Sequence, residues 1–480
     1  MEDIKFNTGN TKFLLIISFV LAAGLCGLLI GYYDYSYEVI ALVAFVPALI
    51  LSVKYIWIPV AGFFFLIPLN ILFVLSSGQT LNKLVAIFLV FLSIITGRIL
   101  QVSEIFRNRK SIYVLWYGLA ALASLFYTNN IDNSLYNLER LWYLIGFYFL
   151  LIMIFRDATK LDYVLWAFVF GAVISVIAPF FFDVGRIEDE ELSRFGGLWG
   201  DQNQFASILV GIMPLSLAFF FSYKSRLAKI AAAASFITLL SGFILTFSRG
   251  GYVAFVLTVM IAITANIVKG RDTIRIFLIA SITFLLSVIF AYFVFNTQLI
   301  GRVETLNVLD SVQSVNAERS LRIRYINYFV IAPKLFVENP VLGSGFHEFI
   351  DYSPYKLNAH NTYLEVLTGL GLLGFIPFVM ILILTLKEFR IYHNYIIKKS
   401  GSYIRFTIAS GLQYGFIGYL ISSLFISTDT NKMLWIFISI SAIMANVMRI
   451  DKKLEHQSAQ VESTKRRRYV PPQQSRQLES

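Results

Sequence analysis

Apolar residues occur along most of this chain in blocks of about twenty, and charged residues separate the blocks. An α-helix needs a block of about that length to cross roughly 30 Å of hydrocarbon, because each residue adds about 1.5 Å along its axis. Of the 480 residues, 57% are hydrophobic and only 14% are charged, against roughly 25% charged in ordinary globular chains. The sequence therefore predicts an all-α, polytopic integral membrane protein with about 12–14 transmembrane helices.

Charged breaks between the blocks delimit the predicted spans. We place them at about 12–32, 36–53, 55–77, 80–100, 111–127, 136–155, 162–182, 203–222, 227–247, 250–268, 273–295, 362–386, 403–426 and 431–449. The two blocks between 36 and 77 are the least distinct, because only Lys54 separates them and prolines interrupt them. The first block lacks a small-residue cleavage pattern and leads into a second span, so we interpret it as a membrane helix rather than a cleaved signal peptide.

Lys and Arg gather on one side of the predicted bundle. If the N-terminus is cytoplasmic, most of these residues fall in cytoplasmic segments, among them 107–110, 224–229, 269–275 and 387–399. The positive-inside rule expects this bias, so both termini are predicted to be cytoplasmic. The polar stretch 450–480 is interpreted as a disordered basic tail, with its charges solvated rather than bound to lipid headgroups.

Several classes of function are excluded or disfavoured by the charges and the motifs. The net charge of +11 does not indicate a nucleic-acid partner, because the basic residues lie between apolar blocks. The single cysteine, Cys26, excludes a disulfide framework and a cysteine-ligated metal site. The sequence contains no Walker A loop, HExxH motif, nucleophile elbow or acidic pair of the DxD type in an outer loop. It predicts neither a metal site nor a cofactor.

The chain divides into four predicted regions. Transmembrane helices occupy 1–182, a core occupies 183–386, further transmembrane helices occupy 387–449, and the tail follows at 450–480. The core contains one long outer loop, 296–361, which is the largest hydrophilic insertion. Loops of this length are usually functional or disordered. Aromatic and aliphatic residues recur in it at helical spacing, so we expect the loop to be partly helical and packed on the membrane domain.

Arg249 is the most informative charged residue. It lies in Phe247-Ser-Arg249-Gly-Gly251, between two strongly apolar runs with almost no loop. A guanidinium at that depth is costly, so we expect it to face a polar cavity, and the adjoining glycines would let a ligand approach the backbone closely. The alternative is an interface anchor whose side chain extends to the headgroups.

A glycine-rich segment, 193–206, enters the span at 203–222. It carries Arg194, Asn203 and Gln204 and is predicted to form a shaped polar surface at the outer membrane face. A flexible connector would explain its glycines, but not two amide side chains at the head of an apolar helix. The acidic stretch 188–191 is interpreted as a solvated part of the same loop.

His360 lies in Ala359-His360-Asn361-Thr362, at the predicted outer end of the span 362–386. The unperturbed pKa of histidine is near neutrality, so His360 is a candidate proton acceptor. The helix dipole at that end disfavours the charged imidazolium. The alternative is a histidine that caps the helix. His347 also lies on the outer side, but we interpret it as part of a turn.

Three motifs follow one another in the core: Arg194-Phe-Gly-Gly with Asn203-Gln-Phe-Ala; Phe247-Ser-Arg249-Gly-Gly; and Glu338-Asn-Pro-Val-Leu-Gly-Ser-Gly345 with Ala359-His360-Asn361-Thr-Tyr-Leu and Gly369-Leu-Gly371-Leu-Leu-Gly374. In this order they resemble the bacterial O-antigen ligase and Wzy-type polysaccharide polymerase superfamily, over about 194–374. The sequence departs from the common pattern at 200–203, where many members carry Pro-Asn, and near Tyr328, where a tryptophan is common. These departures bear on substrate identity more than on activity.

The resemblance implies a metal-independent, inverting glycosyltransferase of the GT-C type in the bacterial plasma membrane, with its site facing the periplasm or the cell exterior. The donor would be a glycan on undecaprenyl diphosphate, and the acceptor a hydroxyl of a glycan or lipid. Arg249, with one or both of Arg322 and Arg324, would hold the diphosphate, because guanidinium groups match its oxygens. Arg194, Asn203 and Asn361 would also bind substrate, and His360 would take the acceptor proton.

Three functions remain open from the sequence. A polymerase of lipid-linked repeat units is slightly favoured, because no separate acceptor-recognition domain is visible, and it would have a chain-length regulator and a flippase as partners. A ligase would move a finished glycan to a lipid core, another surface acceptor or a protein. A transporter or flippase for lipid-linked sugars would need polar residues in both halves of the membrane, whereas the exceptional charges here lie on one face.

Overall fold

The computed structural model describes residues 51–69, 81–98, 103–155, 160–181, 186–189, 192–267, 322–400 and 403–468. The predicted spans at 12–32 and 273–295, and nearly all of 36–53, lie outside the described residues. So do residues 296–321 of the long outer loop and the last part of the tail, 469–480.

Helices make up most of the described chain. They are α3 (Trp57–Leu66), α4 (Leu81–Ile95), α5 (Ser103–Phe106), α6 (Arg109–Ala123), α7 (Ile131–Ile154), α8 (Leu161–Ile177), α9 (Gln202–Ser222), α10 (Arg226–Leu245), α11 (Arg249–Ile267), α15 (Ala332–Glu338), α16 (Phe349–Tyr352), α17 (Thr362–Ser400), α18 (Tyr403–Ser422) and α19 (Lys432–Arg468). Short 3₁₀ turns are η1 (Ile67–Leu69), η2 (Ser124–Phe126), η4 (Ala178–Phe180) and η5 (Gly197–Trp199), and η7 (Asn327–Ile331) is a π-helical segment.

Six helices of the described chain are long and apolar enough to cross a membrane: Ile131–Ile154, Leu161–Phe180, Gln202–Ser222, Arg226–Leu245, Thr362–Ile396 and Lys432–Lys453. Three shorter apolar helices, at Trp57–Leu69, Asn82–Ile95 and Arg249–Thr264, coincide with further predicted spans. The prediction of a helical, polytopic membrane protein is therefore confirmed. One local exception is an antiparallel hairpin of β1 (Arg186–Asp189) and β2 (Leu192–Phe195), in which Arg186 pairs with Phe195. It occupies the segment that we predicted to be a solvated acidic loop.

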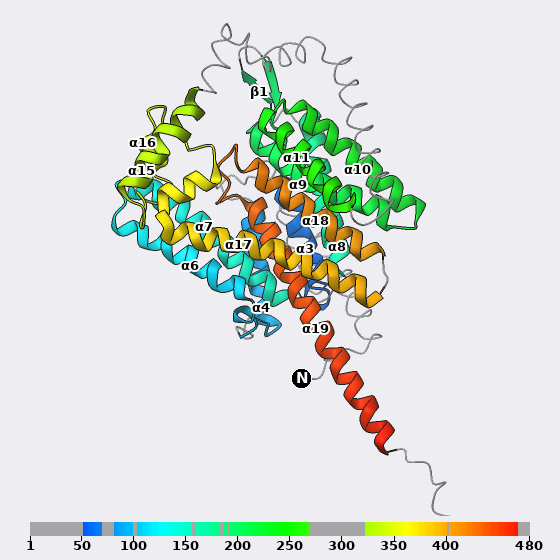
Figure 1. The fold of residues 1–480 in the computed structure, drawn as a ribbon. Coiled ribbons are helices and arrows are strands. Elements are labelled where there is room, and N and C mark those ends of the chain that lie inside the picture. Colours follow the sequence, from blue (N-terminus) through cyan, green and yellow to red (C-terminus); the bar gives the residue numbers. More distant parts are fainter. Residues whose placement is uncertain are drawn as a thin grey trace, which may run out of the picture.

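The helices pack closely around α9. This helix contacts α18, α10 and α11, while α17 lies against α6, α18 and α19 (Figure 1). The crossing of α9 and α18 depends on small residues, because a Cβ atom on Gly415 would lie 2.1 Å from the carbonyl oxygen of Gly211. Small residues at such crossings let membrane helices approach closely. The centre of the bundle is thereby a rigid frame for the helix ends around it.

The starts of α7, α9, α11, α17 and α19 and the end of α18 meet at one end of the bundle, which we call the motif end. The Thr362 N–H donates to the Ser423 carbonyl over 2.9 Å, joining the start of α17 to the end of α18. The Tyr127 hydroxyl, just before α7, donates to the Leu342 carbonyl over 2.6 Å. This grouping matches the helix ends that the sequence analysis assigned to the outer face.

Lys110 lies at the opposite end, the one that the positive-inside pattern predicts to be cytoplasmic. Its side chain is 0% exposed. Its Nζ donates to Glu388 Oε2 over 2.6 Å and to the Ile438 carbonyl over 2.7 Å. The carboxylate and the carbonyl replace water around the ammonium group, which is the condition for burying a charge. The pair joins α6, α17 and α19.

The glycine motif at 369–374 interrupts α17. Gly371 has φ 54° and ψ −159°, and the N–H groups of Ser344 and Gly345 donate to the carbonyls of Thr368 and Gly369. A Cβ atom on Gly343 would lie 2.4 Å from the carbonyl of Gly369. The two glycine motifs therefore interlock, backbone against backbone, and pin the loop 340–345 to α17. Irregular backbone within a membrane helix requires such buried partners.

The last helix, α19, is longer than predicted. It continues beyond 449 to Arg468 and projects from the bundle (Figure 1). The first part of the tail that we expected to be disordered, 450–468, is thus helical. It contains three Lys, three Arg, two Glu and two Gln but no Gly or Pro, so helix propensity favours continuation of the transmembrane helix.

Candidate functional site

The first and second motifs meet where α9 and α11 begin. Asp201 caps α9, since its Oδ1 accepts from the N–H groups of Asn203 and Gln204 at 2.8 and 2.7 Å. The Asn203 side chain accepts a hydrogen bond from Ser248 Oγ over 2.8 Å. Ser248 Oγ in turn accepts from the Gly251 N–H in the first turn of α11. These bonds hold Arg249, which is half-buried, beside the start of α9.

The two glycines after Arg249 are used for packing. A Cβ atom on Gly250 would lie 2.8 Å from Phe425 Cβ, and one on Gly251 would lie 2.9 Å from Ala206 Cβ. We expected these glycines to open the backbone to a ligand. Their Cα atoms instead face neighbouring side chains, so they allow α11 to approach α9 and the turn after α18.

The glycine-rich segment before α9 has a defined structure. Gly197 and Gly200 have φ values of 54° and 76°, which favour glycine. The Trp199 indole N–H donates to the Pro68 carbonyl over 3.0 Å, and the Phe195 ring packs edge-on against Phe205. These contacts argue against the flexible-connector alternative. Arg194 lies on β2, but its side chain is outside the described part of the structure.

His360 adopts a left-handed backbone conformation, with φ 53°. Its carbonyl oxygen accepts a hydrogen bond from the Tyr328 hydroxyl over 2.6 Å, and the same hydroxyl lies 3.1 Å from the Leu424 carbonyl. Leu424 directly precedes Phe425, which packs on Gly250. A continuous series of contacts therefore links the segment of Arg249 to His360.

The electrostatic surroundings of His360 keep its imidazole neutral. Burial lowers the pKa of the imidazole, and the Arg324 guanidinium lowers it further, while the Asp201 carboxylate opposes both effects. The half-buried Arg324 is thus the arginine whose charge acts on His360, together with Asp201 at the cap of α9. Arg322 is exposed. That one or both of these arginines hold a diphosphate stays a prediction.

Asn361 has a local structural role, and its predicted contact with substrate stays a prediction. Its Oδ1 accepts from the N–H groups of Tyr363 and Leu364 at 3.0 and 3.1 Å. These are the bonds of a helix N-cap. Asn361, and not His360, therefore caps α17, and the alternative reading of His360 as the capping residue does not fit the structure.

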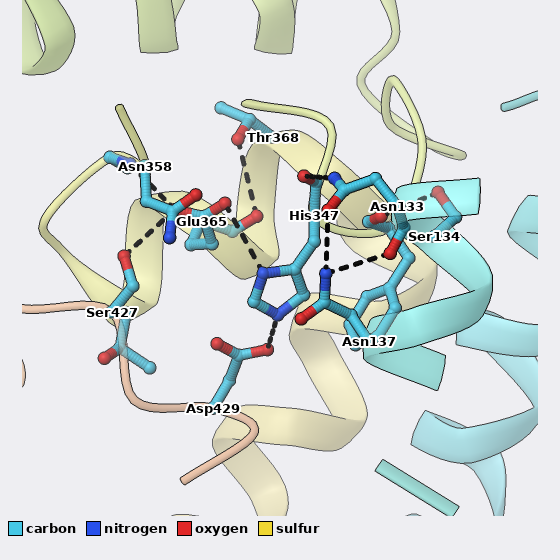
Figure 2. A network of polar contacts seen from close by, with 12 residues as sticks. Asn133, Ser134, Asn137, His347, Asn358, Glu365, Thr368, Ser427 and Asp429 are labelled. Atoms are coloured by element: carbon cyan, nitrogen blue, oxygen red, sulfur yellow. Dashed lines mark hydrogen bonds and ion pairs between the residues drawn. The ribbon is translucent and has the colours of Figure 1, made fainter. Parts of the chain in front are cut away.

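A buried network that the sequence analysis did not predict surrounds His347. Its Nε2 lies 2.9 Å from Asp429 Oδ2, and its Nδ1 lies 4.0 Å from Glu365 Oε1 (Figure 2). Burial by itself would lower the pKa of the imidazole, but the charge and hydrogen bond of Asp429, together with the charge of Glu365, raise the pKa above its usual value. The same contact lowers the pKa of the Asp429 carboxyl, against the effect of burial.

The residues on both sides of His347 attach this network to α7. Asn133 donates to the His347 carbonyl over 2.8 Å, and Ser134 donates to the Phe346 carbonyl over 2.9 Å (Figure 2). The buried Glu348 accepts from the Asn130 N–H over 2.6 Å and from the Thr128 hydroxyl. The sequence offered no signal for this arrangement, because His347 and Asp429 are 82 residues apart and belong to different loops.

Metal ligands do not gather at the motif end as far as the chain is described. No group of three or more His, Cys, Asp and Glu side chains there is arranged to hold a metal ion. The groups brought together include guanidinium, imidazole, amide and hydroxyl side chains, which suit recognition of an anionic substrate and transfer of a proton, beside carboxylates that are engaged in the hydrogen bonds and ion pairs described above.

Comparison with known proteins identifies one family. Residues 234–379 match the O-antigen ligase family, so the match contains Arg249, Arg322, Arg324, His360 and Asn361. It confirms the resemblance seen in the motifs over this part of the chain and supports glycosyl transfer at a membrane in surface polysaccharide biosynthesis. No curated protein matches the chain.

Proposed function

We propose that this chain, whose residues 234–379 match the O-antigen ligase family, is a metal-independent, inverting glycosyltransferase. Its donor is a glycan on undecaprenyl diphosphate, and it acts on the outer face of the bacterial plasma membrane. Polymerisation of lipid-linked glycan units is the reaction we favour. Ligation of a finished glycan to a lipid core, another surface acceptor or a protein is the alternative within the same chemistry.

The observation that carries this proposal is the linked series of contacts from Asn203 to His360. Asn203 bonds to Ser248, Gly250 packs on Phe425, and Tyr328 joins the carbonyls of Leu424 and His360. Five segments that are separated in sequence thus meet at the motif end. The side chains that they supply are those required for a diphosphate and a nucleophilic hydroxyl.

The chemistry follows from these side chains. Guanidinium groups bind diphosphate oxygens through paired hydrogen bonds, which assigns the donor's leaving group to Arg249 and Arg324. Neutral His360 takes the proton of the acceptor hydroxyl while the acceptor oxygen attacks the anomeric carbon of the donor. The bond from that carbon to the diphosphate oxygen breaks, undecaprenyl diphosphate leaves, and the configuration inverts. The arginines stabilise the charge that develops on the leaving group.

The transporter alternative is less well supported. Its pathway would need polar groups in both halves of the membrane. The buried charge at the opposite end of the bundle, Lys110, is already paired with Glu388 in a contact that joins three helices. A structural role accounts for it without a transport pathway.

The test is a reaction of the purified protein with undecaprenyl-diphosphate-linked glycan in detergent, where no membrane separates two compartments. A glycosyltransferase forms a new glycosidic bond and releases undecaprenyl diphosphate. Longer glycans from donor alone indicate a polymerase, whereas product that requires an added lipid or glycan acceptor indicates a ligase. Absence of any covalent product, combined with movement of the donor across proteoliposome membranes, would establish the transporter instead.

A further inference from the structure

The backbone conformation of His360 needs a physical explanation. Its φ of 53° lies in the left-handed region, where a side chain with a Cβ atom is disfavoured. Such a conformation persists only when the surrounding structure over-determines it, and residues of this kind cluster at functional sites. The residues that impose the conformation are therefore candidates for a role in positioning the imidazole.

One constraint acts on the peptide group between Asn358 and Ala359, one residue before His360. Glu365, in the first turn of α17, accepts a hydrogen bond from the Ala359 N–H over 2.8 Å. The same oxygen accepts from Ser427 Oγ over 2.9 Å, which ties it to the turn between α18 and α19. Glu365 is 2% exposed. Figure 2 shows it between Ser427 and His347, so its carboxylate is held from both sides.

A second constraint acts on the peptide group after His360. The Tyr328 hydroxyl donates to the His360 carbonyl and also lies within reach of the Leu424 carbonyl. Burial raises the pKa of Tyr328 to about 12, although Arg324 opposes the shift, so the hydroxyl remains protonated and able to donate. Asn361 completes the constraint by capping α17.

The segment that carries Tyr328 is itself unusual. Residues Asn327–Ile331 form a π-helical turn, and π-helical turns occur frequently at functional sites. Asn327 accepts from Ser353 Oγ over 3.1 Å, and its amide contacts the Asn358 carbonyl at 3.4 Å. Asn327 and Tyr328 thus attach the same turn to both ends of the loop that leads to His360.

We propose that Glu365 and Tyr328 are positioning residues for His360: Glu365 fixes the peptide group that precedes Ala359, Tyr328 fixes the one that follows His360, and together they hold the imidazole beside Arg324. We call the hydrogen bonds of Glu365 and Tyr328 to this segment the clamp. The inference deepens the proposed function, because it assigns a catalytic consequence to the clamp. The clamp itself is a statement about backbone geometry and can be tested without an activity assay.

Tyr328→Phe removes one hydroxyl and leaves the ring. The readout is modification of His360 by diethyl pyrocarbonate, followed at a series of pH values by mass spectrometry of the full-length protein in detergent. The charged groups facing the imidazole are Arg324 and Asp201. In the wild type we expect modification of His360 to reach its half-maximum at a pH below the ordinary histidine pKa of about 6.5. In the variant, we expect the midpoint to move up toward that value and kcat to fall by about 10-fold or more.

Tyr363→Phe is the matched control. Its hydroxyl donates to the Leu420 carbonyl over 2.9 Å, so it also joins α18 but does not touch His360. Both variants should lose similar thermal stability, while only Tyr328→Phe should move the His360 midpoint. An unchanged midpoint in Tyr328→Phe, or an equal shift in both variants, would overturn the clamp.

Glu365 is tested by comparing two substitutions. Glu365→Gln keeps an oxygen that accepts from the Ala359 N–H, whereas Glu365→Leu keeps only the size. If Glu365→Gln retains most activity and Glu365→Leu loses it, the positioning role is supported. Equal loss of activity in both variants contradicts that role and favours an ion pair between Glu365 and His347. The proposed base role is tested separately from the clamp. It fails if His360→Gln remains active, and the clamp still holds in that case if Tyr328→Phe moves the modification midpoint of His360.

Discussion

His360 combines a left-handed backbone, partial burial and a nearby guanidinium. Each of these features costs free energy in isolation, and together they place a neutral imidazole beside a group suited to bind an anion. Arg324 and His360 therefore divide the proposed chemistry between them. In the proposed reaction the cation holds the leaving group, and the same charge disfavours protonation of the base.

The lowered pKa of His360 predicts the pH dependence of transfer. A general base works unprotonated, so activity is lost as the pH falls through its pKa. Burial and Arg324 lower that pKa, so the acidic limb of kcat/KM should lie below the ordinary histidine value of about 6.5. The measurement is the initial rate of transfer at subsaturating donor across that range. A limb at or above about 6.5 would contradict the assignment.

Arg249 should not be replaceable by lysine. An ammonium group keeps the charge but lacks the planar pair of donors that fits a diphosphate. We expect Arg249→Lys to lower kcat/KM by about 10²–10³-fold, the usual loss when one preorganised charge-stabilising donor is removed. Lys334→Ala, which removes an exposed cation on α15, is the control and should be near normal. Near-normal transfer by Arg249→Ala at unchanged protein level would show that the side chain only anchors the interface.

At the scale of elements, the third motif is divided between structure and chemistry. Its glycines at 343 and 371 allow the loop before α16 to pair with the break in α17. Two local signals act on α17: Asn361 caps it and fixes where it begins, and Gly371 breaks it and fixes where it bends. His360, which we propose as the base, lies between the loop and the helix.

The His347–Asp429 pair should make stability depend on pH. The folded-state pKa of His347 is raised, so its contribution is fully present below the unfolded value of about 6.5 and is lost as the pH rises through the folded value. The pKa of Asp429 is lowered, so its contribution is present above about 3.9 and is lost at lower pH.

We therefore expect His347→Gln to cost about 3–5 kcal/mol, as is usual when a buried pair is broken, with the largest effect between these two values. The measurement is thermal unfolding in detergent at several pH values. The difference in Tm between wild type and variant should shrink as the pH rises above about 6.5. A difference that is independent of pH would show that the pair is not ionised.

Sequence patterns predicted the elements that depend on local chemistry. Span lengths followed from apolar blocks, and the meeting of the segments that carry Arg249 and His360 followed from the ordered motifs. The pairing of His347 with Asp429 was not predictable, because it joins two loops with no shared periodicity. The role of Gly250 was misinterpreted for the same reason, since its neighbour, Phe425, is distant in sequence. Helix propensity in 450–468 was a local signal that the overall polarity of the tail obscured.

At the scale of the whole molecule, the motif end is built from segments spread between α7 and α19. The buried Lys110–Glu388 pair lies at the opposite end, and α9 and α18 hold the centre. The proposed chemistry therefore uses a single face of the bundle. The positive-inside pattern predicts that this face is the outer one.

Cysteine labelling tests that orientation. In a variant lacking Cys26, a cysteine at the exposed Lys334 should react with a membrane-impermeant maleimide in intact cells. A cysteine at the exposed Ser225, where α10 begins, should react only after permeabilisation. The reverse pattern would place the motif end in the cytoplasm and contradict a reaction on externally oriented glycans.

The most direct test of the account is transfer by His360→Gln. Glutamine retains a hydrogen-bonding side chain but cannot accept the proton, so the account predicts a loss of about 10²–10⁴-fold in transfer from purified lipid-linked donor. Donor binding and the unfolding temperature should be preserved, because the arginines are proposed to hold the diphosphate and Asn361 caps α17. A His360→Gln protein that transfers glycan at the wild-type rate would contradict the central claim that this imidazole is the base.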